Sequence, residues 1–150
     1  MRHAITLAVL AAGFTCATGA GAFEPFKDFI PGKEVHNVVF VKVDPNRIDD
    51  YLEGLKATWW SGCEVGRKLG EIKRCAIYVS TTPMQSDFNM MLVQTYASGA
   101  DLDPDETKYN RYMSEMRKQL EKAKQDKIVE GYNEMRTFYG EREFREITFK

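Results

Sequence analysis

The stretch VHNVVFVKV, residues 35–43, decides the fold of this chain, and it ends at Asp44-Pro45. It is rich in β-branched valine and is stopped by an Asp-Pro pair, a pattern that predicts a β-strand. Val38 and Phe40 alternate with further valines such as Val39. Because successive side chains of a strand point to opposite faces, this pattern predicts a sheet that is buried on both sides.

A helix is predicted directly after this strand. Asp44 can cap it, with Pro45 at its first position, and apolar residues then recur at helical spacing. The apolar stripe consists of Ile48, Leu52, Leu55 and Trp59. Ser61-Gly62 is expected to end the helix, and strands over 72–80 and 88–98 follow as an antiparallel hairpin.

A second, longer helix is predicted over residues 104–139, with Asp103 as its cap. Apolar and aromatic residues form one stripe of this segment, and Lys, Glu and Arg cover its other face. Gly131 is the position where the helix is expected to bend. Gly140 is expected to stop it, and residues 143–150 are expected to form the last strand.

The element order β-α-β-β-α-β predicts an α+β domain over residues 35–150, ferredoxin-like, with a four-stranded antiparallel sheet. Residues 23–34, with two prolines and a glycine, are expected to be an irregular lead-in. Two helices cover only one face of such a sheet. Since the strands are apolar on both faces, a second copy is the simplest cover, which predicts a homodimer with its sheets packed face to face.

Residues 1–22 have the three-part layout of a cleavable secretory signal. Arg2 precedes an apolar run, and Ala20-Gly21-Ala22 supplies small residues for cleavage before Phe23. Cys16 leaves lipidation as a less favoured alternative. The sequence therefore predicts a periplasmic or secreted protein with no membrane span after cleavage. The formal net charge of −1 gives no indication of nucleic-acid binding.

The order of elements resembles the dimeric α/β-barrel superfamily. Residues 36–45, HNVVFVKVDP, resemble the opening His-x-Val-x-Phe-Lys-x-x-x-Pro of stress-responsive barrel domains. Relatives of this fold include cofactor-independent monooxygenases, muconolactone isomerase-like enzymes, and haem-degrading or haem-binding proteins. The resemblance implies a cavity between the sheet and its helices, but it does not identify the ligand of that cavity.

His36 is the only histidine that remains after removal of the signal. On its strand it shares a face with Val38 and Phe40, so it is expected to line either the cavity under the helices or the dimer interface. There it can serve as a general base, and the alternative is a hydrogen-bonded histidine at a strand start. No metal site is predicted, because no carboxylate or cysteine lies at ligand spacing. No cofactor is predicted, although one axial histidine would suffice for a haem.

Aromatic residues are the second group of binding candidates. A tyrosine buries its ring and keeps a hydroxyl that needs a partner, so several of them suit a partly aromatic ligand, although they also serve as plain core. The candidates on the strands and helices are Tyr78, Tyr96, Trp60, Tyr112 and Tyr132. Arg136 near the end of the long helix either complements the helix dipole or, turned inward, holds a carboxylate in a fork.

Cys63 and Cys75 remain after cleavage of the signal. In an oxidising compartment they pair, or else Cys75 is simply a small buried hydrophobic residue. The leading hypothesis is a homodimer that binds a small aromatic or apolar molecule between sheet and helices. The first alternative is a cofactor-independent enzyme of the monooxygenase, isomerase or lyase type with His36 as general base. The second is a structural dimer without a ligand.

Overall fold

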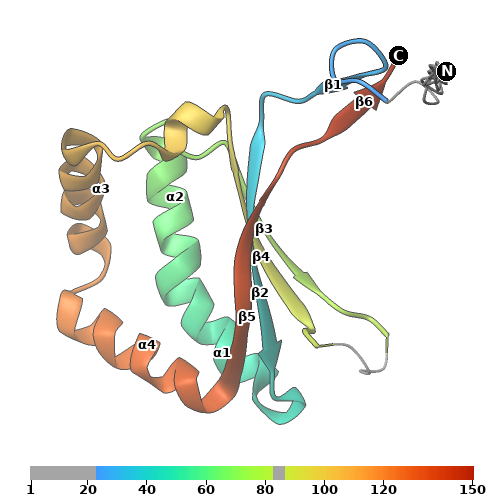
Figure 1. Cartoon of the computed structure of the whole chain (residues 1–150). Coiled ribbons are helices and arrows are strands. Elements are labelled where there is room, and N and C mark those ends of the chain that lie inside the picture. The colour runs from blue at the N-terminus through green and yellow to red at the C-terminus, as the bar shows by residue number, and fades with distance from the viewer. Residues whose placement is uncertain (1–22, 83–86) are drawn as a thin grey trace, which may run out of the picture.

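The main sheet of the protein has four antiparallel strands in the order β3-β4-β2-β5 (Figure 1). The structure is a computed structural model that describes residues 23–82 and 87–150, so the predicted signal peptide lies outside the described residues. The strands are β2 (Val35–Val43), β3 (Arg74–Val79), β4 (Met90–Tyr96) and β5 (Arg136–Phe144). This order confirms the ferredoxin-like arrangement that the sequence predicts.

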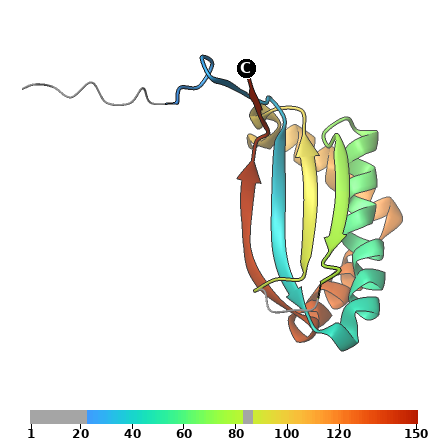
Figure 2. The ribbon, with the colours of Figure 1, turned by 90° about the vertical axis from the view of Figure 1, so that its right-hand side faces the viewer.

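The helices lie together on one face of this sheet, and Figure 2 looks onto the opposite, open face. The first helical segment is longer than predicted. It runs through α1 (Ile48–Leu55), a π turn at Lys56–Trp60 and α2 (Ser61–Lys68), and it is preceded by a 3₁₀ turn at Pro45–Arg47.

Gly62 does not end this helix, contrary to the prediction. A Cβ atom at Gly62 would lie 2.4 Å from the Tyr112 hydroxyl, so the glycine serves a close contact between two helices. The helix ends instead before Gly70, whose φ of +73° is readily adopted only by a residue without a side chain.

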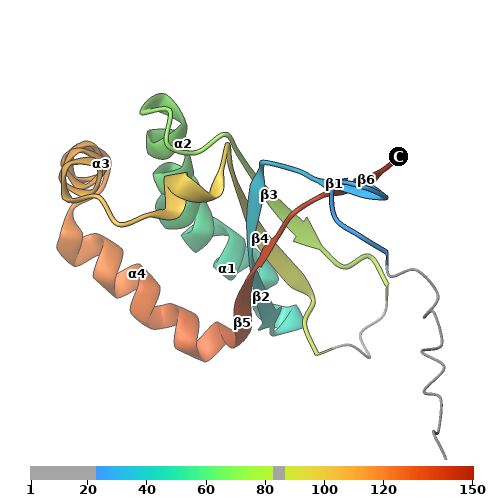
Figure 3. The same ribbon diagram turned by 45° about the horizontal axis from the view of Figure 1, so that its top comes forward.

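The predicted long helix is broken into α3 (Glu106–Gln119) and α4 (Lys122–Met135), after a 3₁₀ turn at Gly99–Leu102. The break falls at Leu120 and Glu121, which have extended backbone, and Gly131 remains inside α4. Leu120 is buried, and Arg117 Nη1 donates to Gln125 Oε1 across the break at 2.8 Å. The break allows α3 to pack on α2 while α4 packs on α1 (Figure 3).

The last part of the chain also differs from the prediction. β5 begins at Arg136, directly after α4, and pairs with β2 along its whole length. Gly140, with φ +134°, lies opposite Phe40 beside a shift in register, so it accommodates a β-bulge and does not stop a helix.

A separate two-stranded ribbon extends from one end of the sheet. It pairs β1 (Phe29–Pro31) with β6 (Ile147–Phe149), so the predicted lead-in is partly ordered and only the end of the predicted last strand is a strand of its own. The ribbon bends away from the helix layer in Figures 1 and 3. Phe23 packs on Phe29 and Phe149 of this ribbon.

The core lies between the sheet and the helices. Its buried residues are Val41, Val43, Tyr51, Leu55, Met90, Leu92 and Tyr132. Asn89, just before β4, is buried beside it. Asn89 accepts a hydrogen bond from the Val43 N–H at 2.7 Å and donates one to the Val43 carbonyl at 2.8 Å, so its side chain extends the ladder where β4 has not yet begun.

Candidate functional site

A cavity with a volume of about 280 Å³ lies between β4, β5 and the helices. Most of its wall is apolar and comes from three helical segments and one strand. The main apolar lining residues are Leu55, Trp59, Leu92, Met113, Met116 and Val129. The polar lining residues are Thr58, Gln94, Tyr112, Gln125, Tyr132 and Arg136. This is the cavity under the helices that the resemblance implied.

Arg136 is held at the wall of this cavity by two tyrosines. As the first residue of β5 it lies opposite Val43, on the helix side of the sheet. Its Nη1 donates to the Tyr51 hydroxyl at 2.6 Å. Its Cζ lies 5.5 Å from the Tyr51 ring centroid and 5.2 Å from that of Tyr132, which is cation–π distance. Arg136 has therefore turned inward, the second of the two options that the sequence left open.

Tyr132 forms a short polar pair with Thr58 inside the cavity. The two hydroxyl oxygens are 2.6 Å apart, and Thr58 donates its own proton to the Gly54 carbonyl at 2.9 Å. The Tyr132 hydroxyl is therefore the donor to Thr58. Burial raises the pKa of Tyr132, and also that of Tyr51, above the usual value, so both phenols remain neutral at physiological pH.

Gln94 was not among the residues that the sequence singled out, yet it lines the cavity from the middle of β4. Its position on the helix side, in a strand that is otherwise mostly apolar, was the available signal. Gln94 Nε2 lies 3.5 Å from Cys63 Sγ, and its Oε1 accepts a hydrogen bond from the Tyr96 hydroxyl at 3.3 Å. Gln94 therefore links the cavity to the disulfide.

Tyr96 and Tyr112 share a neighbouring hollow of about 240 Å³, and Tyr112 also lines the main cavity. Burial raises the pKa of both phenols. Tyr96 does not line the main cavity. The structure thus brings Tyr112, Tyr132 and Arg136 together and sets Tyr96 beside them.

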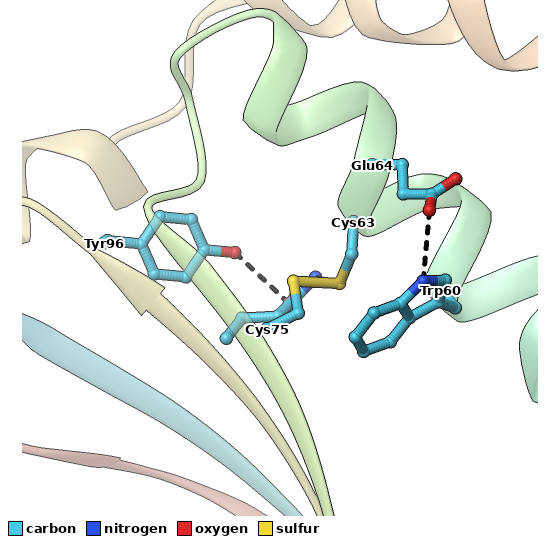
Figure 4. The surroundings of a disulfide bond; sticks show 6 residues. Trp60, Cys63, Glu64, Cys75 and Tyr96 are labelled. Atoms are coloured by element: carbon cyan, nitrogen blue, oxygen red, sulfur yellow. Dashed lines mark hydrogen bonds between the residues drawn. A yellow bond between two sulfur atoms is a disulfide. The ribbon is translucent and has the colours of Figure 1, made fainter.

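Cys63 and Cys75 form a disulfide that joins α2 to β3, with their Cα atoms 6.2 Å apart (Figure 4). The sequence had left pairing and simple burial open. Trp60 lies close to this bond, and its indole N–H donates to Glu64 at 3.2 Å. Trp60 does not line the cavity, contrary to the prediction. Trp59 lines the cavity instead, because its side chain lies on the face of the continuous helix that packs against the core.

His36 and Tyr78 lie on the open face of the sheet, away from the cavity. His36 alternates with the core-facing valines of β2, and Tyr78 is paired with Met91, whose neighbours Met90 and Leu92 face the core. His36 Nδ1 is 3.0 Å from the Oγ1 of buried Thr95. The expectation that His36 and Tyr78 would contact a ligand under the helices is therefore wrong, and His36 cannot be the axial ligand of a haem in that cavity.

Within residues 23–82 and 87–150, no group of three or more His, Cys, Asp or Glu side chains could hold a metal ion. No helix in these ranges is long and apolar enough to cross a membrane.

Neither a family model nor a curated protein matches this sequence. Similar solved structures include a conserved protein of unknown function from Bacteroides thetaiotaomicron, described as a possible oxidoreductase. It is 13% identical, with a TM-score of 0.44, over 77% of this chain and 99% of that chain. A putative antibiotic biosynthesis monooxygenase from Nitrosomonas europaea is 12% identical, with a TM-score of 0.41, over 81% of this chain and 93% of that chain.

A dimeric protein of unknown function with a ferredoxin-like fold from Bacteroides fragilis is also similar. It is 11% identical, with a TM-score of 0.38, over 81% of this chain and 100% of that chain. The strand order β3-β4-β2-β5 of this chain is that of a ferredoxin-like sheet.

Proposed function

We propose that this protein binds a small, partly aromatic or apolar molecule in the cavity between the sheet and α1, α3 and α4. The observation that carries the proposal is a cavity of about 280 Å³ with an apolar wall and a few polar side chains placed within it. Ligand pockets of proteins have this composition and volumes of roughly 300–1,000 Å³. At about 280 Å³ the cavity lies just below that range, and it suits a compound of about one aromatic ring.

The two methionines of α3 favour a ligand of this kind. Met113 and Met116 line the cavity, and an unbranched thioether adapts its shape to an aromatic or irregular apolar ligand. On the sheet side Gln94 offers an amide, which can orient a polar substituent of the ligand.

A cavity-filling variant tests the proposal. The protein from Phe23 onward is screened against small aromatic and branched aliphatic compounds by ligand-observed NMR and thermal shift. Met113→Trp is expected to abolish binding because the indole occupies the space, while Tyr109→Trp, at an exposed position of the same helix, is expected to leave it unchanged. Equal binding to the wild type and to Met113→Trp would place the ligand elsewhere and refute the proposal.

We propose further that a second copy of this chain covers the open face of the sheet. Phe40, Met91 and Val93 are partly exposed on this face, and none of the described helices lies over it (Figure 2). An apolar sheet face needs a cover, and a two-fold contact of identical faces provides one without a second protein. The β1–β6 ribbon, with exposed Phe149, bends toward the same side and enlarges this surface.

The proposed place of action is the periplasm or the cell exterior. The signal-like segment 1–22 supports it, and so does the Cys63–Cys75 disulfide, because such bonds persist in oxidising compartments. Intact-mass measurement on protein purified from its own host is expected to give a chain that starts at Phe23 and lacks the two thiol hydrogens. A chain that retains residues 1–22 would contradict this localisation.

The position of His36 bears on the enzymatic alternative. A general base must come within hydrogen-bond reach of the proton that it abstracts. Because His36 lies on the opposite face of the sheet, it does not act on a molecule in the cavity. Small-molecule binding is therefore the function that the geometry supports best.

A further inference from the structure

We infer that Arg136 makes the cavity selective for small organic monoanions, of which carboxylates with an aromatic or branched aliphatic body are the best fit. This inference rests on the proposed function, and it names the ligand class of that same cavity. It is carried by a half-buried guanidinium that lines an otherwise uncharged wall.

The charge of Arg136 is not neutralised within the described structure. A guanidinium remains protonated in proteins, and removing it from water is costly unless a negative charge compensates. Among residues 23–82 and 87–150, no carboxylate lies within ion-pair distance of Arg136. Its partners are the hydroxyl of Tyr51 and the two tyrosine rings, and these phenols stay neutral because burial raises their pKa values.

The orientation of Arg136 leaves donors available for a ligand. The contact with Tyr51 uses Nη1, and the rings of Tyr51 and Tyr132 hold the guanidinium by cation–π contact. An arginine side chain carries five N–H donors in a planar fork, and a carboxylate can accept two of them in parallel. Because the fork is already fixed by packing, little conformational freedom is lost when an anion binds.

The rest of the wall limits the ligand to one negative charge. Of the described residues that line the cavity, Arg136 is the only one with a charged side chain. A dianion such as a phosphate monoester would leave one charge without a partner beside Leu55, Leu92 and Met116. A monocarboxylate instead places its single charge at Arg136 and its hydrocarbon body against these residues.

The C-terminus of α4 is the competing explanation for the position of Arg136. The residue follows the last turn of this helix, where a cation favours the helix dipole. That interaction needs only a cation near the helix end. It does not require the contact with Tyr51 or a place in the cavity wall, both of which the structure shows.

The test compares a carboxylate with its uncharged analogue of equal size. Phenylacetate and phenylacetamide are titrated into the oxidised protein from Phe23 onward at neutral pH, with dissociation constants from NMR shifts. Phenylacetate is expected to bind the wild type at least about tenfold more tightly, since hydrogen bonds to charged groups are the strong ones. Equal or tighter binding of the amide would overturn the inference, and this comparison needs no variant.

Two variants then assign the preference to the guanidinium. Arg136→Gln is expected to remove it, and Arg136→Lys is expected to keep only part of it, because a point charge replaces the fork. Arg142→Gln removes a cation of the same strand on the open face, opposite Val38, and is expected to leave the preference intact. A preference that persists in Arg136→Lys and Arg136→Gln alike would overturn the assignment.

Failure of this inference can be told apart from failure of the proposed function. If amide and carboxylate bind equally and Met113→Trp abolishes both, the cavity binds small molecules without charge selection. If binding of both survives Met113→Trp, the ligand lies outside the cavity and both proposals fail.

Discussion

The buried side chain of Asn89 takes the place of backbone hydrogen bonds at the point where the ladder between β2 and β4 ends. Its amide satisfies both the N–H and the carbonyl of Val43, and the residue is only 4% exposed. A buried backbone group without a partner costs free energy comparable to a lost hydrogen bond. The sequence placed Asn89 inside the predicted strand 88–98 and did not single it out, because its partners are backbone groups of Val43, which is distant in the sequence.

Asn89→Ala is expected to lower the free energy of unfolding by about 2–4 kcal/mol, because two buried backbone groups lose their partner. Urea denaturation followed by circular dichroism measures this loss. Asn46→Ala serves as the control, since the exposed Asn46 side chain donates to Asp44 at the surface, and a change of less than about 0.5 kcal/mol is expected there. Equal losses in both variants would contradict the role of Asn89.

The buried tyrosines give the protein a pH dependence in the alkaline range. Burial raises the pKa values of Tyr51, Tyr96, Tyr112 and Tyr132 above the ordinary value of 10.0. Above that pH the unfolded chain loses phenolic protons that the folded chain retains, so the unfolded state binds fewer protons. The contribution of these tyrosines to the free energy of unfolding is therefore fully present below pH 10.0. It is lost as the pH rises through their folded-state pKa values.

The expected result is a fall in the free energy of unfolding above about pH 10, with part of the tyrosinate absorbance appearing only as the chain unfolds. Ionisation of all tyrosines near the ordinary pKa, with no loss of stability, would contradict the prediction.

At the scale of elements, the position of two glycines shows how helix packing overrides local signals. Gly62 lies in a continuous helix. A glycine is needed there because the Tyr112 hydroxyl of α3 occupies the space of a Cβ atom. Gly131 in α4 has only the Met135 methyl within 4 Å of such a Cβ, at 3.8 Å. The same residue type is therefore required at one position and dispensable at the other.

Gly62→Ala is expected to destabilise the fold by about 1–3 kcal/mol through overpacking against Tyr112. Gly131→Ala is expected to stabilise it by about 0.5–1 kcal/mol, because alanine favours a helix interior. Thermal denaturation of the two variants decides the point, and Tyr112→Phe in the Gly62→Ala background should recover part of the loss. A stabilised Gly62→Ala protein would show that the helix contact is loose.

For the whole molecule, the open face of the sheet is the feature with the largest consequence. Val93→Glu places a charge in the middle of that face and is expected to convert a dimer into a monomer without loss of secondary structure, because a buried unpaired charge is costly. Sedimentation equilibrium measures the mass. Tyr109→Glu on the helix side is the control and should remain dimeric, whereas a monomeric wild type would refute the dimer.

The sequence by itself determined the element order and hence the ferredoxin-like sheet. Its alternating valines, the Asp44-Pro45 stop and the turn signals act within a few residues, and such local patterns are legible without a structure. The tertiary structure alone decided where the second helix breaks, that Gly140 belongs to a strand, and which face holds each candidate residue. Arg136 lines the cavity and His36 lies on the other face of the sheet. The sequence did not show this, because strand register and helix packing are set by contacts between distant segments.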